Sequence, residues 1–249
     1  MQIPIGLAHI VVFFRLFKKF CMISKRNHLF VQYGCGLSQP DNWLNFDSTP
    51  SLFVARIPLS KHLAKLALKY TDINNSSTFS PPRALQIIRN IIETKAIYGD
   101  ITKGLPIHLK SSSQVYASHV IEHLPFCSAK LALINTLKIL EPGGCFRLVV
   151  PNLSFYINKY ISSNQANAAI SFCIETGMGT EVWPNIFSRM RGDSHHLMYD
   201  SKALQYLLDS IGFSSVREAK YGDSVFDFSA VENPDRWCYP ENIGFECIA

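Results

Sequence analysis

Two small groups of residues in this 249-residue chain have the types and spacing to do chemistry. The first follows an apolar run at 29–31, where the chain reads Gly34-Cys35-Gly36, and a second apolar run then ends in Asp47. Glycine at the carboxyl end of a strand lets the backbone approach a ligand closely, because no Cβ is in the way. A carboxylate that ends the next strand is well placed to accept hydrogen bonds from ribose hydroxyls. The pattern outlines an adenosine-binding site, but a glycine turn between two buried strands explains it equally well.

The spacing departs from the dinucleotide-binding fingerprint, which needs a third glycine and an acidic residue about 20 positions further on. Here Gln39 and Pro40 follow the turn, no third glycine comes after them, and Asp47 arrives early. A second carboxylate, Asp100, follows the short apolar run 95–98. Two carboxylates at expected strand ends favour a ligand-binding edge more than either one alone.

The second group comes directly after the buried-strand pattern 114–117, where residues 118–125 read SHVIEHLP. In open α/β sheets, ligands bind at the carboxyl ends of the strands, so these polar side chains are candidates for a site. Glu122 and His123 could instead serve only to cap the following helix. The His-x-x-Glu-His spacing also suggests a metal, but no further ligand cluster in the sequence supports one, and we predict no metal site.

These groups need a scaffold, and the apolar pattern of the chain predicts an alternating α/β order. Short apolar runs typical of buried strands alternate with longer stretches of helical period. Prolines at 81–82 and the Glu-Pro-Gly-Gly sequence at 141–144 mark a helix start and a helix stop. The expected strands are 29–31, 43–46, 95–98, 113–118, 145–150, 215–219 and 245–249, and the expected helices are 59–70, 84–94, 129–139, 153–160, 165–175 and 201–208.

Composition limits the class of protein further. The chain is 47% hydrophobic with a net charge of +5, which suits one globular domain. No block of like charges is long enough for a nucleic-acid tail, so no nucleic-acid partner is expected. The seven cysteines contain no C-x-x-C pair, and neither a disulfide framework nor a zinc site is supported. We therefore expect a reducing, cytoplasmic location.

The N-terminal apolar run 3–14 is followed by Arg15, Lys18 and Lys19. It is too short for a spanning helix, which needs about 20 apolar residues, and its charge order does not suit a secretory signal. It is expected either to cover one edge of the sheet or to lie at a membrane surface with its lysines on lipid phosphate. The second alternative would make the protein peripheral to a membrane.

Several longer stretches together resemble the class I S-adenosylmethionine-dependent methyltransferases. They are YGCG, NFD, YGDITKGLP, VYASHVIEHLP, LEPGGCFRLVVPNL, HHLMYD, LLDSIGF and PENIGFECIA. The chain looks most like the predicted methyltransferases associated with surface-polysaccharide and glycan biosynthesis, and the resemblance covers nearly its whole length. It implies an α/β fold with a Rossmann-like sheet, mostly parallel with an antiparallel edge, flanked by helices and carrying helical insertions.

The resemblance also implies a domain organisation. Residues 1–249 are expected to form a single methyltransferase domain. Within it, 1–28 is an N-terminal helical extension, 49–95 is a helical insertion, and 153–192 is a cap over the acceptor. The oligomeric state is left open.

The same resemblance assigns roles to the first group of residues. It implies that Tyr33, Gly34, Cys35 and Gly36 hold the methionine part of S-adenosylmethionine and that Asp47 binds the ribose. Asp100 would face the adenine amino group, with Ile101 flanking the ring, and Ser118 and His119 would lie beside the donor methyl. Two departures, Asn152 for a usual aspartate and His196 for another polar residue, fall on the expected acceptor side.

Methyl transfer from a sulfonium needs donor and acceptor held in line with water excluded. A sugar hydroxyl also needs a base to take its proton, and histidine suits that task near neutral pH. His195, which lies shortly before the helix expected at 201–208, and His119 are the first candidates, and His123 is the third. We expect O-methylation of a sugar or glycan intermediate. The alternatives are a small-molecule amine or quinone-like acceptor, or a non-catalytic scaffold with the same fold.

Overall fold

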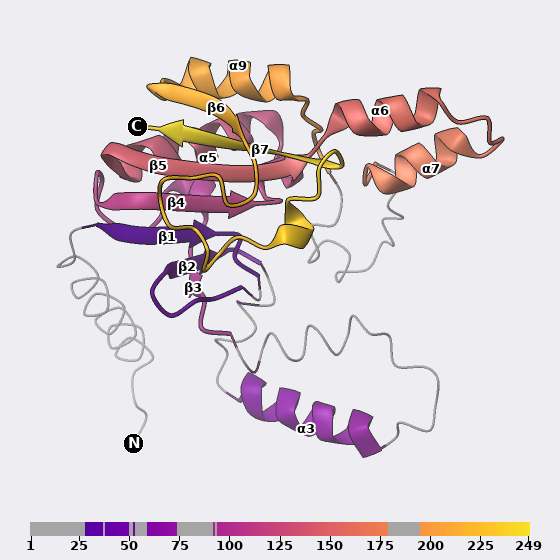
Figure 1. Ribbon diagram of the computed structural model, residues 1–249. Helices are drawn as coiled ribbons and strands as arrows, with labels where there is room; N and C mark the ends of the chain where they lie inside the picture. The colour runs from indigo at the N-terminus through magenta and orange to yellow at the C-terminus, as the bar shows by residue number, and fades with distance from the viewer. Residues whose placement is uncertain are drawn as a thin grey trace, which may run out of the picture.

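The protein has a seven-stranded mixed sheet in the part of the chain that its structure, a computed structural model, describes (Figure 1). That part comprises residues 28–36, 38–49, 52, 59–73, 92, 94–178 and 195–249. The strand order is β3-β2-β1-β4-β5-β7-β6, with β4 at the centre. Strands β1 to β5 run parallel, whereas β7 runs antiparallel to both of its neighbours, β5 and β6. The predicted sheet, mostly parallel with an antiparallel edge, is therefore confirmed.

The element bounds follow the apolar pattern closely. The strands are β1 Leu29–Tyr33, β2 Leu44–Asp47, β3 Ile97–Tyr98, β4 Ser112–Ser118, β5 Leu140–Pro151, β6 Ser215–Ala219 and β7 Asn242–Ile248. The helices are α3 Ser60–Ile73, α5 Phe126–Ile139, α6 Leu153–Ile161, α7 Ala168–Glu175 and α9 Ser201–Ile211, with short 3-10 turns η1 Ile101–Lys103, η2 Ile121–His123 and η3 Pro234–Arg236. None of these helices is long and apolar enough to cross a membrane.

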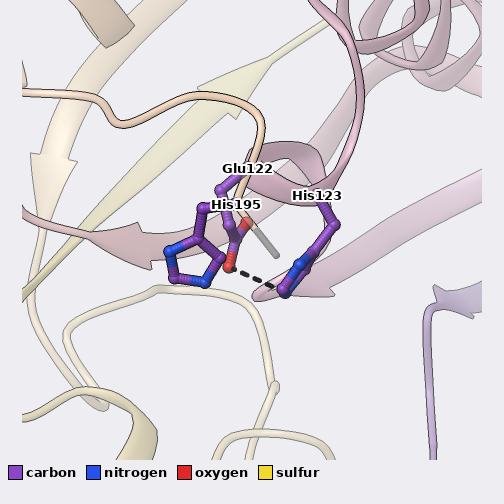
Figure 2. Close-up of side chains that lie close together, drawn as sticks. All are labelled: Glu122, His123 and His195. Atoms are coloured by element: carbon purple, nitrogen blue, oxygen red, sulfur yellow. Dashed lines mark ion pairs between the residues drawn. The ribbon is translucent and has the colours of Figure 1, made fainter. Parts of the chain in front are cut away.

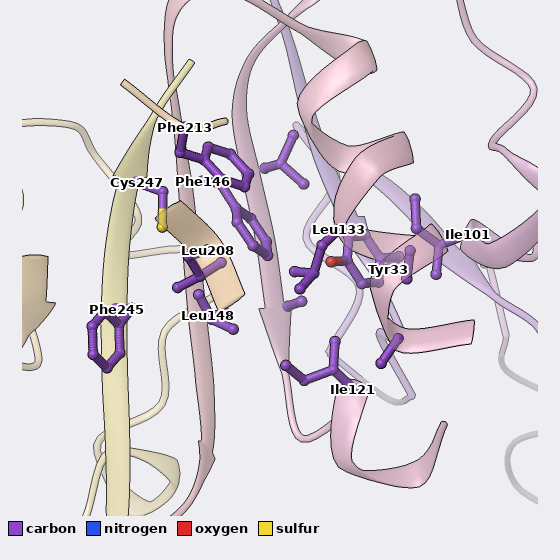
Figure 3. Close-up of a cluster of buried hydrophobic side chains, with 14 of the residues drawn as sticks. Tyr33, Ile101, Ile121, Leu133, Phe146, Leu148, Leu208, Phe213, Phe245 and Cys247 are labelled. Atoms are coloured by element: carbon purple, nitrogen blue, oxygen red, sulfur yellow. The ribbon is translucent and has the colours of Figure 1, made fainter. Parts of the chain in front are cut away.

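The main core lies between one face of the sheet and the helices α5 and α9 (Figure 3). Alternate residues of the central strands point into it, as the period of two along a strand requires. Val115 and Ala117 of β4 and Phe146 and Leu148 of β5 are at most 2% exposed. Leu133 of α5 packs among them with no exposed surface. The sheet therefore presents a rigid edge on which side chains at the strand ends are positioned.

Among the described residues, the opposite face is covered by the long connection between β6 and β7, residues 220–241 (Figure 1). The parallel pair β1 and β2 is joined only by the short loop 34–43, although such crossovers usually contain a helix that covers the sheet. Trp237 and Phe228 of the connection pack there against Tyr116 of β4 and Val149 of β5. Among the described residues, the connection therefore takes the place of a helical layer on this face of the sheet.

A buried guanidinium anchors this connection to the sheet. Arg147 of β5 has no exposed surface, and it pairs with Glu232 at 2.7 Å, Glu246 at 2.8 Å and Asp223 at 2.9 Å. Its Nη2 also donates to the carbonyl of Lys220 at 2.8 Å. Burial alone would lower the pKa of Arg147, but these carboxylates outweigh it and the pKa is raised. A charge buried in this way needs all of its partners, so the network fixes where residues 220–232 lie.

Several predictions of local structure can be compared directly. The expected helix 59–70 is present as α3, in which Leu63 and Leu66 are 66% and 52% exposed. The helices α6 and α7 of the expected cap 153–192 are also present. Most of the expected helix 84–94 (all but residues 92 and 94), the N-terminal extension up to residue 27 and residues 179–192 of the expected cap lie outside the described residues.

Candidate functional site

The glycine turn after β1 adopts the conformation for which glycine is needed. Gly34 and Gly36 have φ angles of +64° and +51°, a region that other residues enter only at a cost. A Cβ on Gly34 would lie 2.3 Å from Cγ2 of Val120, whereas one on Gly36 would meet nothing within 4 Å. The absence of a side chain at Gly34 therefore lets the turn after β1 touch the segment after β4. The two groups of residues identified in the sequence are neighbours in space.

Asp47 holds this turn in place. Its carboxylate accepts a hydrogen bond from the backbone N–H of Gly36 at 2.9 Å and another from Thr49 at 2.7 Å, and the residue is 5% exposed. Each carboxylate oxygen has a second lone pair, so these bonds leave acceptor capacity for a ligand hydroxyl. The buried negative charge also affects Cys35: burial first and Asp47 second raise the pKa of its thiol to about 12. The thiol of Cys35 is therefore neutral, and it does not act as a thiolate nucleophile.

The acidic residue after β3 lies at the same edge of the sheet. Asp100 caps η1, accepts from the backbone N–H and the hydroxyl of Thr102, and pairs with Lys103 at 3.0 Å. Burial opposes its ionisation, but these contacts outweigh it and the pKa of Asp100 is lowered. The next residue, Ile101, is only 5% exposed and packs into the main core. Its side chain therefore has little free surface on which the expected adenine ring could stack.

A cavity of about 260 Å³ opens beside the glycine turn at the carboxyl ends of β1 and β4. Of the residues expected to bind the cofactor, Tyr33, Gly34, Cys35 and Ser118 line it, whereas Gly36, Asp47, Asp100, Ile101 and His119 do not. The rest of the wall is Gln32, Ser38, Tyr116, Ala230, Val231, Glu232, Asn233 and Arg236. The sequence analysis missed the residues from 230–236. Their signal was a long connection leaving the carboxyl end of β6, at the same edge of the sheet.

The wall of this cavity offers complementary polar groups. Gln32 is 3% exposed, and its Nε2 donates to the carbonyl of Ser38 at 2.8 Å. Its Oε1 is buried and has no hydrogen-bond partner among the described residues, which is costly unless a ligand supplies a donor. Arg236 provides a guanidinium at the same cavity. An amino group and a carboxylate on one ligand would satisfy both.

The second group forms a cluster around a buried carboxylate (Figure 2). Glu122 has no exposed surface, and its Oε1 lies 3.3 Å from Nδ1 of His119 and 3.8 Å from Nε2 of His123. The rings of His123 and His195 meet edge to face with centroids 4.7 Å apart. His119 itself has a φ of +54°, uncommon for a residue with a side chain. All three histidines proposed as bases therefore gather at the end of β4.

His195 is positioned by the cap helix α7. Its Nδ1 lies 2.8 Å from the carbonyl oxygen of Thr176, just after that helix. Because a carbonyl can only accept, Nδ1 must carry the hydrogen, and in the neutral ring Nε2 keeps its lone pair. Burial, and next the nearby His123, lower the pKa of His195. The backbone N–H groups of His196 and Leu197 donate to the carbonyl of Glu122, which ties this segment to η2.

Two expectations are changed by this geometry. The sequence offered no third ligand to accompany Glu122 and His123, but His195 joins them, and one donor atom from each lies within 4.8 Å of the others. The sequence could not show this third member because it is remote in the chain, and the prediction of no metal site stays a prediction. Asn152, which replaces an expected aspartate, caps α6 through Ser154 and donates to the carbonyl of Pro240. It has a local structural role.

No protein-family model and no curated protein sequence matches this chain. Solved structures match at low identity: "PigF with SAH" at 10% identity and a TM-score of 0.44 covers 89% of this chain. A SAM-dependent methyltransferase from Archaeoglobus fulgidus (12%, TM-score 0.43) covers 96% of this chain and 93% of its own, and one from Thermotoga maritima (11%, TM-score 0.42) covers 96% of each. The chain spans about half the length of PigF and of the CurJ carbon methyltransferase. These likenesses are distant, and the chemistry has to come from the residues of the site.

Proposed function

We propose that this protein is an enzyme that uses S-adenosylmethionine to methylate a hydroxyl group, on a sugar or glycan intermediate. The observation that carries the proposal is the joined unit of glycine turn and carboxylate. Gly36 donates to Asp47 at the carboxyl edge of the sheet, and the turn beside it opens into a cavity. This is the arrangement expected for a nucleoside with a polar tail.

The cavity suits the amino-acid end of that cofactor. Arg236 has the charge and fork geometry for a carboxylate, and the buried Oε1 of Gln32 can accept from an ammonium group. Glu232 lies on the same wall, with its carboxylate paired with Arg147 at 2.7 Å. When bound, the sulfonium supplies an activated methyl group. The chain then has to orient an acceptor and take its proton.

The histidine cluster supplies the proton acceptor. With Nδ1 committed to the carbonyl of Thr176, the Nε2 of His195 is the nitrogen that can take the proton of an acceptor hydroxyl. The lowered pKa keeps the ring in the neutral form that a base requires. His119, on the segment that touches Gly34 through Val120, would then lie between donor and acceptor. The polar character of this cluster favours a hydroxyl acceptor over a quinone-like ring.

Two measurements test the proposal. Calorimetry should give binding of S-adenosylmethionine and S-adenosylhomocysteine in the micromolar range, and a screen of nucleotide sugars should give methyl transfer with one of them. His195→Ala should lower turnover by roughly 10²–10⁴-fold with cofactor affinity nearly unchanged, while His62→Ala, at an exposed histidine of α3, serves as a control. Binding without transfer to any hydroxyl, but with transfer to an amine, would replace the acceptor. Absence of binding would make the chain a scaffold.

A further inference from the structure

We infer that Glu122, His123 and His195 bind one divalent transition-metal ion. The inference rests on the geometry of the cluster and does not require the proposed methyl transfer. Two imidazole nitrogens and one carboxylate are a ligand set that Zn²⁺ and Fe²⁺ sites use when they keep positions open for water or substrate. Figure 2 shows the carboxylate of Glu122 between the two rings.

The Glu122 carboxylate is fully buried, and neither of its oxygens has a hydrogen-bond partner among the described residues. The nearest nitrogens, on His119 and His123, are 3.3 and 3.8 Å from Oε1, too far for the short bonds of a charge-assisted pair. A buried carboxylate is costly unless it is paired or coordinates a metal. The described residues therefore give the Glu122 carboxylate no short hydrogen bond, and a bound cation would supply a close partner.

The candidate ligand atoms of Glu122, His123 and His195 lie close together: one from each residue is within 4.8 Å of the other two. Bonds of about 2.1 Å to one ion place its ligand atoms roughly 3–4 Å apart. Side-chain movements on the order of 1 Å would therefore close the cluster on an ion.

The ring of His195 is also held in an orientation that suits a metal ligand. A metal-binding histidine usually donates its other N–H to a carbonyl or carboxylate, which fixes the ring and its tautomer. His195 has this arrangement, because Nδ1 donates to the carbonyl of Thr176 and leaves Nε2 as the ligand. Gly177 packs against the same ring, since a Cβ there would lie 3.1 Å from it. His195 is therefore held from two sides.

The ion would also connect the cap to the sheet. Glu122 and His123 belong to η2 after β4, whereas His195 is fixed by the end of α7. In the metal-bound protein His195 is a ligand and no free base, and an acceptor hydroxyl on the ion is made more acidic by the ion itself. The base role of His195 then applies only to the metal-free chain.

The test is a metal titration of the full-length protein after treatment with a chelator. Calorimetry with Zn²⁺ and with Co²⁺ should give one tight equivalent, and Mg²⁺ should bind far more weakly because nitrogen ligands favour the transition ions. The Co²⁺ complex should show d–d absorption without the near-ultraviolet band of cobalt–thiolate bonds, which separates this site from the cysteines. Glu122→Gln and His195→Ala should each weaken binding at least about 100-fold, and His196→Ala should leave it unchanged.

Unfolding curves of the metal-free variants establish that each one folds, and Glu122→Gln, which keeps the shape of the side chain, replaces any variant that does not. The inference is overturned if the wild-type protein lacks a tight equivalent, if Glu122→Gln binds Zn²⁺ as well as wild type, or if thiolate absorption appears. Binding of S-adenosylhomocysteine to the metal-free chain is measured separately. It should persist, because the cavity beside Gly34 shares none of the three ligands. Failure of the metal site and failure of the proposed function are therefore distinguishable.

Discussion

Gly34 and Gly36 in the turn after β1 require glycine on different physical grounds. Both have positive φ angles. Only at Gly34 would a side chain also clash with a neighbour, since an added Cβ would lie 2.3 Å from Val120. Backbone strain and contact can therefore be separated by experiment at these two positions.

Gly34→Ala should lower both stability and affinity for S-adenosylhomocysteine, because the turn must move away from the segment after β4. The matched change Gly36→Ala should cost only the backbone term of about 1–2 kcal/mol. Thermal melts and calorimetry of the two variants check this. Val120→Ala combined with Gly34→Ala should recover part of the loss. Equal behaviour of the two single variants would refute the close contact.

Asp47 combines a structural and a ligand-binding task, and substitution should reveal both. Removing a charged acceptor of two backbone N–H groups should lower the free energy of unfolding of Asp47→Ala by roughly 1.5–3 kcal/mol. Cofactor affinity should fall further than this loss of stability explains. Urea unfolding and calorimetry on the same samples measure the two effects. If Asp47→Ala binds the cofactor with normal affinity, the role of Asp47 is limited to holding the turn.

At the scale of elements, the connection 220–241 links the antiparallel edge to the candidate site. Gly244 of β7 lets the Trp237 ring lie against the strand, since a Cβ there would be 2.1 Å from the ring. The indole N–H donates to the hydroxyl of Tyr116 at 3.2 Å, and the same ring lies 4.6 Å from the guanidinium of Arg147. These contacts hold η3, and with it Arg236, against the cavity beside the glycine turn.

Arg236→Ala tests whether this connection binds the ligand. The side chain is exposed and the structure gives it no role in the core, so the melting temperature should change little. Affinity for S-adenosylhomocysteine should fall by about tenfold or more, the usual cost of a charge-assisted hydrogen bond. Lys202→Ala, which removes an exposed charge from α9 on the other face, is the control. Equal affinity in the two variants would place the ligand carboxylate elsewhere.

At the scale of the whole molecule, stability depends on a network of charges between β5, β6, β7 and the connection. Asp223 accepts hydrogen bonds from Arg217, from the backbone N–H of Lys220 and from Arg147. Burial opposes its ionisation, but these contacts hold the pKa of Asp223 at about 2. A folded-state pKa below the unfolded value means stability that is present above the unfolded pKa and is lost as pH falls.

The contribution of Asp223 should therefore be complete above about pH 4 and should disappear towards pH 2. The measurement is the free energy of unfolding of wild type and of Asp223→Asn at pH 6, 4 and 3. The difference between the two proteins should shrink as the pH is lowered. A constant difference would mean that the carboxylate is not ionised through this network, and Asp235→Asn, at an exposed residue in the same connection, serves as control.

Much of this protein could be predicted from its sequence by itself. The apolar runs predicted β4 and β6 to within one residue, because the period of a strand and its burial are local properties. The strand β5 instead begins at Leu140, within the segment that was expected to stop the preceding helix. The glycine turn was also local, since it depends on the backbone within a few positions. The expected ligand-binding edge of the sheet followed from the order of the elements.

Other features were decided only by the tertiary structure. The meeting of Glu122 with His195, the contact of His195 with Thr176, and the cover formed by 220–241 join segments that are far apart in the chain. No local propensity encodes such contacts, because they arise when the helices and strands pack into one core. Arg147 is an example. A charged residue is not expected within a buried strand, and it is stabilised there by three carboxylates that the fold brings close to it.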